Sequence, residues 1–121
     1  MKRGRGFDRT QRIADLMQKT LAQMLITDMS DERFHLVTIT GLSLARDLST
    51  AKVYVSVLMD DPQKIKEVII SLNQAAKPLR YNLAHMIKLR IMPELKFVYD
   101  ESTARGFHIS GLIDSAMKKQ K

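Results

Sequence analysis

Hydrophobic residues recur at helical spacing in two stretches of the chain. The first stretch follows Asp8, which can cap a helix together with Gln11 three positions later. The second follows Asp61 and Pro62, a favoured N-cap residue and a proline suited to the first helical turn. Both patterns predict amphipathic helices with one buried face. The apolar positions are Ile13, Leu16, Met17, Leu21, Met24 and Leu25 in the first stretch, and Ile65, Val68, Ile69, Leu72 and Ala76 in the second.

Alternation of apolar and polar residues predicts three strands. The strand around Val53 alternates without a break, whereas the strand before it changes parity at Gly41. That change predicts a β-bulge, which would let both halves of the strand face the core. A short turn joins these two strands, so we expect an antiparallel hairpin. The apolar positions are Val37, Ile39, Leu42 and Leu44, then Ala51, Val53, Val55 and Val57, and in the third strand Leu95, Phe97 and Tyr99.

The stretch Gln74–Arg90 predicts a helix interrupted at Lys77 and Pro78. Proline lacks a backbone N–H and disfavours the α conformation in the residue before it. We therefore expect Lys77 to be extended or kinked, and Pro78 to occupy the first turn of a new helix. This second helix is predicted to end at Ile91–Pro93.

The charged residues of this stretch are all basic. On a helical wheel Lys77, Arg80 and Lys88 share one face, and apolar residues share another. Such a face is a candidate RNA-binding element, and a solvated basic face on an ordinary helical hairpin is the competing interpretation. Arg90 departs from the shared face, and for it we favour an ion pair or a cap on helix-end carbonyls.

The composition of the chain favours a polyanionic partner. The 121 residues fit one domain, and their net charge of +7 favours a nucleic acid as partner. Residues 1–7 form a basic arm that we expect to be flexible. Arg9 and Arg12 follow it in the predicted first helical turn, where positive charge opposes the helix dipole. That conflict suggests that these two arginines serve a ligand.

The sequence lacks the patterns of common catalytic and metal sites. It contains no cysteine, which excludes disulfides, zinc ribbons and thiol catalysis. His35, His85 and His108 fall in separate predicted elements without metal-ligand spacing, and no phosphate loop is present. We therefore expect a protein that is not an enzyme and needs no metal or cofactor. Neither a signal peptide nor an apolar run of membrane-spanning length occurs, so we expect a cytoplasmic protein without membrane contact.

The order of elements predicts an α+β fold, in which helices cover one face of a three-stranded sheet. An interrupted helix pair beside such a sheet is typical of KH-type RNA-binding domains. We assign residues 8–101 to this domain, and residues 102–121 to a C-terminal extension with a short helix and a basic tail. No oligomerisation signal stands out, and we expect a monomer.

A series of short motifs runs through the hairpin and the third strand: Val37-Thr38-Ile39-Thr40, Asp47-Leu48, Ala51-Lys52-Val53-Tyr54-Val55-Ser56, Leu89-Arg90, Pro93, Leu95, Phe97 and Asp100. Together with Arg9, Arg12 and Ile13, their order and spacing resemble the bacterial ribosome-binding factor A family, over residues from about Arg9 to Ile113. The resemblance implies a KH-like fold of the second topological type, α-β-β-α-kink-α-β. It also implies a non-enzymatic factor that binds the small (30S) ribosomal subunit and its 16S RNA. Such factors act late in subunit assembly, assist processing of the RNA precursor and support growth in the cold.

One position departs from the family pattern. The family replaces the glycine loop of other KH domains with an Ala-x-Gly kink, and the aligned residues here are Ala75, Ala76 and Lys77. The glycine is therefore absent, and Pro78 directly after it would have to impose the break by a different route.

The resemblance and the charge pattern together predict contacts with the phosphates of folded ribosomal RNA. A general KH-type reader of single-stranded RNA is the alternative, although a glycine loop is not evident and only 6% of residues are aromatic. A protein-interaction module would instead use the net acidic segment from Asp28 to Asp61. The predicted RNA contacts are Arg9, Arg12, Lys77, Arg80 and Lys88.

Overall fold

The computed structural model describes residues 4–27 and 31–101 as an α+β domain, which confirms the predicted fold class. The side chains of residues 4–8 and the predicted C-terminal extension, residues 102–121, lie outside the described part. In chain order the elements are α1 (Gly4–Thr27), the 3-10 helix η1 (Glu32–Leu36), β1 (Val37–Leu44), β2 (Thr50–Val57), α2 (Pro62–Gln74), α3 (Ala76–Met86) and β3 (Glu94–Tyr99).

The sheet has the strand order β1-β2-β3, with β1 antiparallel to β2 and β3 parallel to β2. The register of the first pair shifts between Ile39 and Gly41, which confirms the predicted bulge. Because of this shift, the apolar residues on both sides of the bulge pair with the buried residues of β2. These pairs are Val37 with Val57, Ile39 with Val55, Leu42 with Val53, and Leu44 with Ala51.

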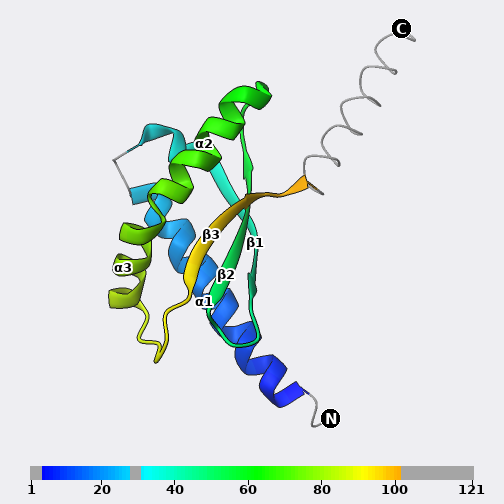
Figure 1. Cartoon of the computed structure of the whole chain (residues 1–121), viewed down its shortest axis with the longest axis vertical. Coiled ribbons are helices and arrows are strands. Elements are labelled where there is room, and N and C mark those ends of the chain that lie inside the picture. The colour runs from blue at the N-terminus through cyan, green and yellow to red at the C-terminus, as the bar shows by residue number, and fades with distance from the viewer. Residues whose placement is uncertain (1–3, 28–30, 102–121) are drawn as a thin grey trace, which may run out of the picture.

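The helices cover one face of the sheet, as predicted. Helix α1 contacts β1, while α2 and α3 both contact β3, and Figure 1 shows α2 and α3 beside that strand. The core between the layers includes fully buried Met17, Leu21, Val53 and Leu83. On the opposite face of the sheet, Lys52 of β2 and Lys96 of β3, which are register partners, are exposed. The amphipathic pattern of each element therefore decided which side of it was buried.

Helix α1 begins earlier than predicted, at Gly4 and not at Asp8. Arg9 and Arg12 consequently lie beyond the first turn, and the dipole argument for their role does not apply. Residues 4–7, expected in a flexible arm, are helical, and residues 1–3 are outside the described part. The apolar periodicity starts only at Ile13, so the pattern contained no signal for this polar extension of the helix.

The two helices after the hairpin meet at Ala75, whose φ of −87° and ψ of 0° lie outside the regular helix. Its N–H donates to both Ser71 O (3.0 Å) and Leu72 O (3.1 Å), and its carbonyl accepts the first bond of α3 from Leu79 N (3.0 Å). Lys77, which was expected to be extended or kinked, is instead the second residue of α3, and the break lies at Ala75, the first residue of the predicted kink Ala75–Pro78.

Pro78 explains why the chain breaks three residues earlier. A proline ring in a continuous helix collides with the carbonyl four residues before it, which here belongs to Gln74, the last residue of α2. Once the new helix starts at Ala76, Pro78 lies in its first turn, where no N–H has a helical partner. Proline disfavours the α conformation in the residue before it, yet Lys77 adopts that conformation. With Pro78 in the first turn, α3 loses no hydrogen bond, and this outweighs the steric restriction on Lys77.

Helix α3 also ends earlier than predicted, at Met86. Ile87 has an extended backbone (φ −119°, ψ 121°), and its side chain is buried against the core. Burying Ile87 turns the chain towards β3, so Lys88, Arg90 and Ile91 lie in the connection and not on the helix. Among the described helices, none is both long and apolar enough to span a membrane.

Candidate nucleic-acid interface

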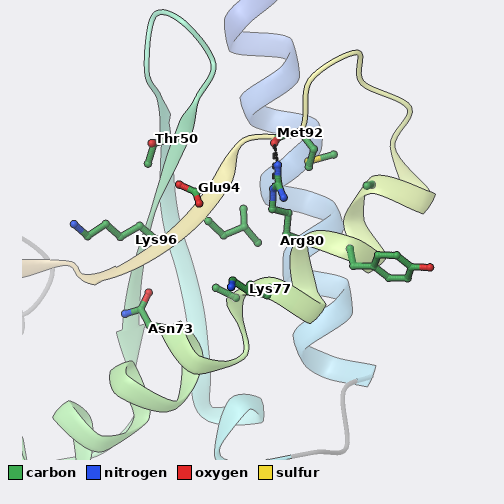
Figure 2. Close-up of a pocket in the computed structure, with 11 residues that line it drawn as sticks. Thr50, Asn73, Lys77, Arg80, Met92, Glu94 and Lys96 are labelled. Carbon is green, nitrogen blue, oxygen red and sulfur yellow. Dashed lines mark hydrogen bonds between the residues drawn. The ribbon is translucent and has the colours of Figure 1, made fainter.

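A groove of about 820 Å³ lies between β3 and the two helices α2 and α3. We call it the β3 groove, after the edge strand that forms one of its walls. Figure 2 shows Lys77 and Arg80 extending from α3, Glu94 and Lys96 extending from β3, and Asn73 near the end of α2. Three cationic side chains and one carboxylate therefore line the groove, which favours an anionic ligand.

The side chain of Asn73 occupies part of the free edge of β3. Its amide nitrogen donates to Phe97 O (3.0 Å), and its oxygen accepts from Phe97 N (2.8 Å). The asparagine amide thus replaces the peptide group of a missing neighbouring strand. Phe97 is buried in the core, so this pair of bonds also fixes the end of α2 against the sheet.

The backbone of Leu95 faces the β3 groove. Glu94 N donates to Ser49 O (3.0 Å) and Asp100 N donates to Val55 O (2.8 Å), so even-numbered residues of this strand direct their N–H groups towards β2. Leu95 lies two residues before Phe97 and has the same parity, which directs its N–H and carbonyl to the side of the groove. The groove therefore presents backbone donor and acceptor groups as well as cations.

Arg80 binds protein carbonyls at the end of the α3–β3 connection. Its Nε donates to Met92 O (3.1 Å) and Pro93 O (3.1 Å), and a terminal nitrogen donates to Met92 O at 2.6 Å (Figure 2). This arrangement holds the returning chain against α3 and fixes the start of β3. Arg80 adds positive charge to the groove, but its geometry identifies it first as a positioning residue.

Lys77 and Lys96 are the cations that remain available. Both are exposed, and neither ammonium group makes a hydrogen bond or ion pair with another residue in the described part of the chain. Lys77 lies in the first turn of α3, and Lys96 alternates with the buried residues of β3. Lys77 extends from the helical wall of the groove, whereas Lys96 extends from β3 on the side away from Lys77 (Figure 2). Both flexible ammonium groups suit contacts with phosphates.

The structure brings together only two of the five predicted RNA contacts, Lys77 and Arg80. Lys88 is exposed in the connection after α3 and does not line the β3 groove, because the helix that would have aligned it ends at Met86. Arg9 and Arg12 are exposed on the N-terminal half of α1, and they too are absent from the groove lining.

The groove residues that were missing from the predicted set include Asn73, Tyr81 and Lys96. Tyr81 follows Lys77 by one helical turn, so the helical wheel could have identified it. Lys96 was recognised only as a polar position of the third strand. No sequence pattern indicates the role of Asn73, because its partner is 24 residues away along the chain.

Arg90 makes no ion pair or hydrogen bond with the residues that the structure describes, contrary to the favoured interpretation of a cap or ion pair. Within residues 4–27 and 31–101, no group of three or more potential ligands is arranged to hold a metal ion. His35 and His85 lie in η1 and α3, and His108 is outside the described residues.

Comparison with known proteins assigns the chain to one family. Residues 9–113 match the family model described as ribosome-binding factor A. A protein of that name from Pseudomonas fluorescens is 46% identical over 112 residues, which cover 92% of this chain and 84% of the relative.

Solved structures agree with this match. The solution structure of a Thermotoga maritima protein described as a putative ribosome binding factor A is 30% identical, with a TM-score of 0.63 over 74% of this chain and 85% of that one. A homology model of the Thermus thermophilus ribosome binding factor A, fitted into a cryo-electron-microscopy map of a 30S complex, is 24% identical. Its TM-score is 0.60 over 73% of this chain and 91% of that one, which supports the KH-like fold.

Proposed function

The chain belongs to the ribosome-binding factor A family, and we propose on this basis that it binds the small (30S) ribosomal subunit through 16S RNA. The observation that carries the proposal is the family match over residues 9–113. The Thermus thermophilus protein fitted into a 30S complex supports the choice of subunit. We further propose that the chain acts in the cytoplasm as a monomeric, non-enzymatic factor in late subunit assembly.

The β3 groove is the RNA-binding surface in this proposal. Lys77 contacts a phosphate at the helical wall and Lys96 contacts one at the outer margin of β3, while Arg80 holds the start of β3 against α3. The bound protein holds an immature conformation of the RNA, assists processing of the precursor, and leaves when the mature conformation forms. Assembly at low temperature is where such assistance matters most, because misfolded RNA rearranges slowly.

Fractionation of a cell extract on a sucrose gradient tests the proposed partner. We expect the protein with free small subunits and not with translating ribosomes. An even distribution over all RNA-containing fractions would contradict an assembly role.

Charge reversal tests the proposed surface. The double substitution Lys77→Glu and Lys96→Glu should weaken co-sedimentation with purified small subunits by more than about tenfold, because each phosphate contact contributes to affinity. The matched control is Lys64→Glu with Lys66→Glu, which changes the net charge equally on exposed positions of α2 outside the groove lining. Equal binding by both double variants would remove the β3 groove from the proposal while leaving the partner unchanged.

A general reader of single-stranded RNA is the second candidate, because the backbone groups of Leu95 are open to the β3 groove. A short unpaired oligonucleotide is the discriminating probe. Sequence-selective binding of free oligonucleotides as tight as binding of small subunits would favour this candidate.

A further inference from the structure

Tyr81 is an exposed aromatic residue on the wall of the β3 groove. The residue is 66% exposed, and it lies on α3 one turn after Lys77. Its ring is braced by His85, one turn further on, with ring centroids 4.5 Å apart and an interplanar angle of 54°. His85 is itself held, because its Nδ1–H donates to the Tyr81 carbonyl at 2.9 Å.

The fold gives Tyr81 no packing role that explains its position. The buried residues of α3 are Leu79 and Leu83, on the other side of the helix. Single exposed apolar residues are common in proteins, and Ile26 and Leu58 are two more in this one. Tyr81 differs from both because it lines a groove, lies beside an available cation, and has its ring orientation restrained by a neighbour.

We propose that Tyr81 is a stacking platform for an unpaired nucleobase of the bound RNA, while Lys77 contacts a phosphate of the same strand. Residues four apart on a helix are neighbours on its surface, so one strand can meet both side chains. Stacking on an aromatic ring tolerates any base, because every base has a π face. This inference rests on the proposed function and adds to it the state of the RNA, an unpaired segment at the groove.

The charge of the surroundings selects RNA over an apolar peptide as the occupant. Lys77, Arg80 and Lys96 line the same groove against one carboxylate, Glu94. An apolar peptide would gain nothing from the three cations, whereas a nucleotide uses an aromatic face and a cation together.

The test compares Tyr81→Phe with Tyr81→Leu in binding to purified small subunits. Phenylalanine keeps the ring, so we expect binding within about twofold of the unaltered protein. Leucine keeps apolar bulk and helix propensity but removes the π face, and should weaken binding roughly 5- to 100-fold. Tyr54→Leu, on the sheet face away from the helices, is the matched control and should bind normally. Circular dichroism confirms the fold of each variant.

Salt dependence and a fluorescent base separate stacking from a charge effect. Tyr81→Leu should leave unchanged the slope of the logarithm of the binding constant against the logarithm of the salt concentration. Lys77→Ala should make that slope less steep by about 0.7 to 0.9. A 2-aminopurine placed in a short unpaired RNA should be quenched by the unaltered protein and by Tyr81→Phe, but not by Tyr81→Leu.

Normal binding by Tyr81→Leu, or loss of binding in Tyr81→Phe equal to that in Tyr81→Leu, would overturn the stacking role and leave the proposed function intact. Absence of subunit binding by the unaltered protein would instead overturn the proposed function, and the stacking role with it.

Discussion

Both edges of the sheet are protected against pairing with a further strand, but by different means. The β1 edge is interrupted by the bulge between Ile39 and Gly41, which breaks the regular row of backbone groups. The β3 edge is regular, and it is covered in part by helices and in part by the Asn73 amide. Both devices hinder pairing with another strand, and the β3 groove lies beside the second edge.

This difference shows how an edge is protected while space remains beside it for the proposed ligand. A bulge interrupts the regular spacing of backbone groups along the edge itself. At the β3 edge the Asn73 amide occupies the backbone groups of Phe97. The backbone groups of Leu95, two residues earlier, still face the β3 groove. Partial closure therefore excludes a continuous strand while admitting a smaller ligand.

The largest expected difference between the edges concerns subunit binding. A new carboxylate at Ala84, an exposed residue that lines the β3 groove, should weaken binding about tenfold or more because it repels phosphates at short range. The same carboxylate at Ser43, an exposed residue of β1, should change binding less than twofold. Co-sedimentation of Ala84→Glu and Ser43→Glu with small subunits measures both effects. Equal losses in both variants would show that the two edges are equivalent for binding.

Among the substitutions of polar residues at the β3 edge, removal of the Asn73 amide should reduce stability most. Asn73→Ala loses both bonds to the Phe97 backbone, and we expect the free energy of unfolding to fall by about 1–2 kcal/mol. The loss is no larger because water then binds part of the freed N–H and carbonyl groups of Phe97. Asn82→Ala, at an exposed position of α3, controls for the gain in helix propensity. Urea denaturation measures both variants, and an unchanged midpoint for Asn73→Ala would show that the edge does not depend on this amide.

Arg80→Ala should have a smaller effect on stability, about 1 kcal/mol, because its carbonyl partners are partly exposed. The control is Arg90→Ala, since Arg90 is exposed in the connection and should contribute little. Thermal unfolding separates the two. A loss of subunit binding in Arg80→Ala without any loss of stability would instead indicate direct contact between this guanidinium and RNA.

Gly41→Ala should have the smallest effect, within about 0.5 kcal/mol of the unaltered protein. No glycine in the described residues has a positive φ, and a Cβ built at Gly41 meets Tyr54 Cδ2 at 3.8 Å, an ordinary contact distance. The bulge thus depends on the register of the apolar residues and not on the freedom of glycine. Urea denaturation would contradict this view if alanine cost more than about 1 kcal/mol.

Much of the fold could be predicted from local patterns. The hairpin, the bulge at Gly41 and the cap and proline that begin α2 depend on residues close together in the sequence, so alternation and capping signals identify them. The ends of helices were less predictable. Helix α1 extends through polar residues to Gly4, and α3 stops at Met86 because Ile87 is buried in the core.

The candidate site was predicted only in part, through Lys77 and Arg80. Helical periodicity placed these two residues on one face, but it did not show that Arg80 would bind the carbonyls of Met92 and Pro93. It also placed Lys88 on the same face, and the early end of α3 removed it.

The sequence by itself determined the order of elements, the buried face of each, the family, and the excess of positive charge. The order of elements, the buried faces and the charge follow from composition and from spacings of two to four residues, whereas the family follows from the match over residues 9–113. Only the tertiary structure decided that the chain breaks at Ala75, that Asn73 closes the edge at Phe97, and that Lys77 faces β3 across a groove. Such features depend on which distant segments the packed core brings together, and a local pattern does not specify the partner.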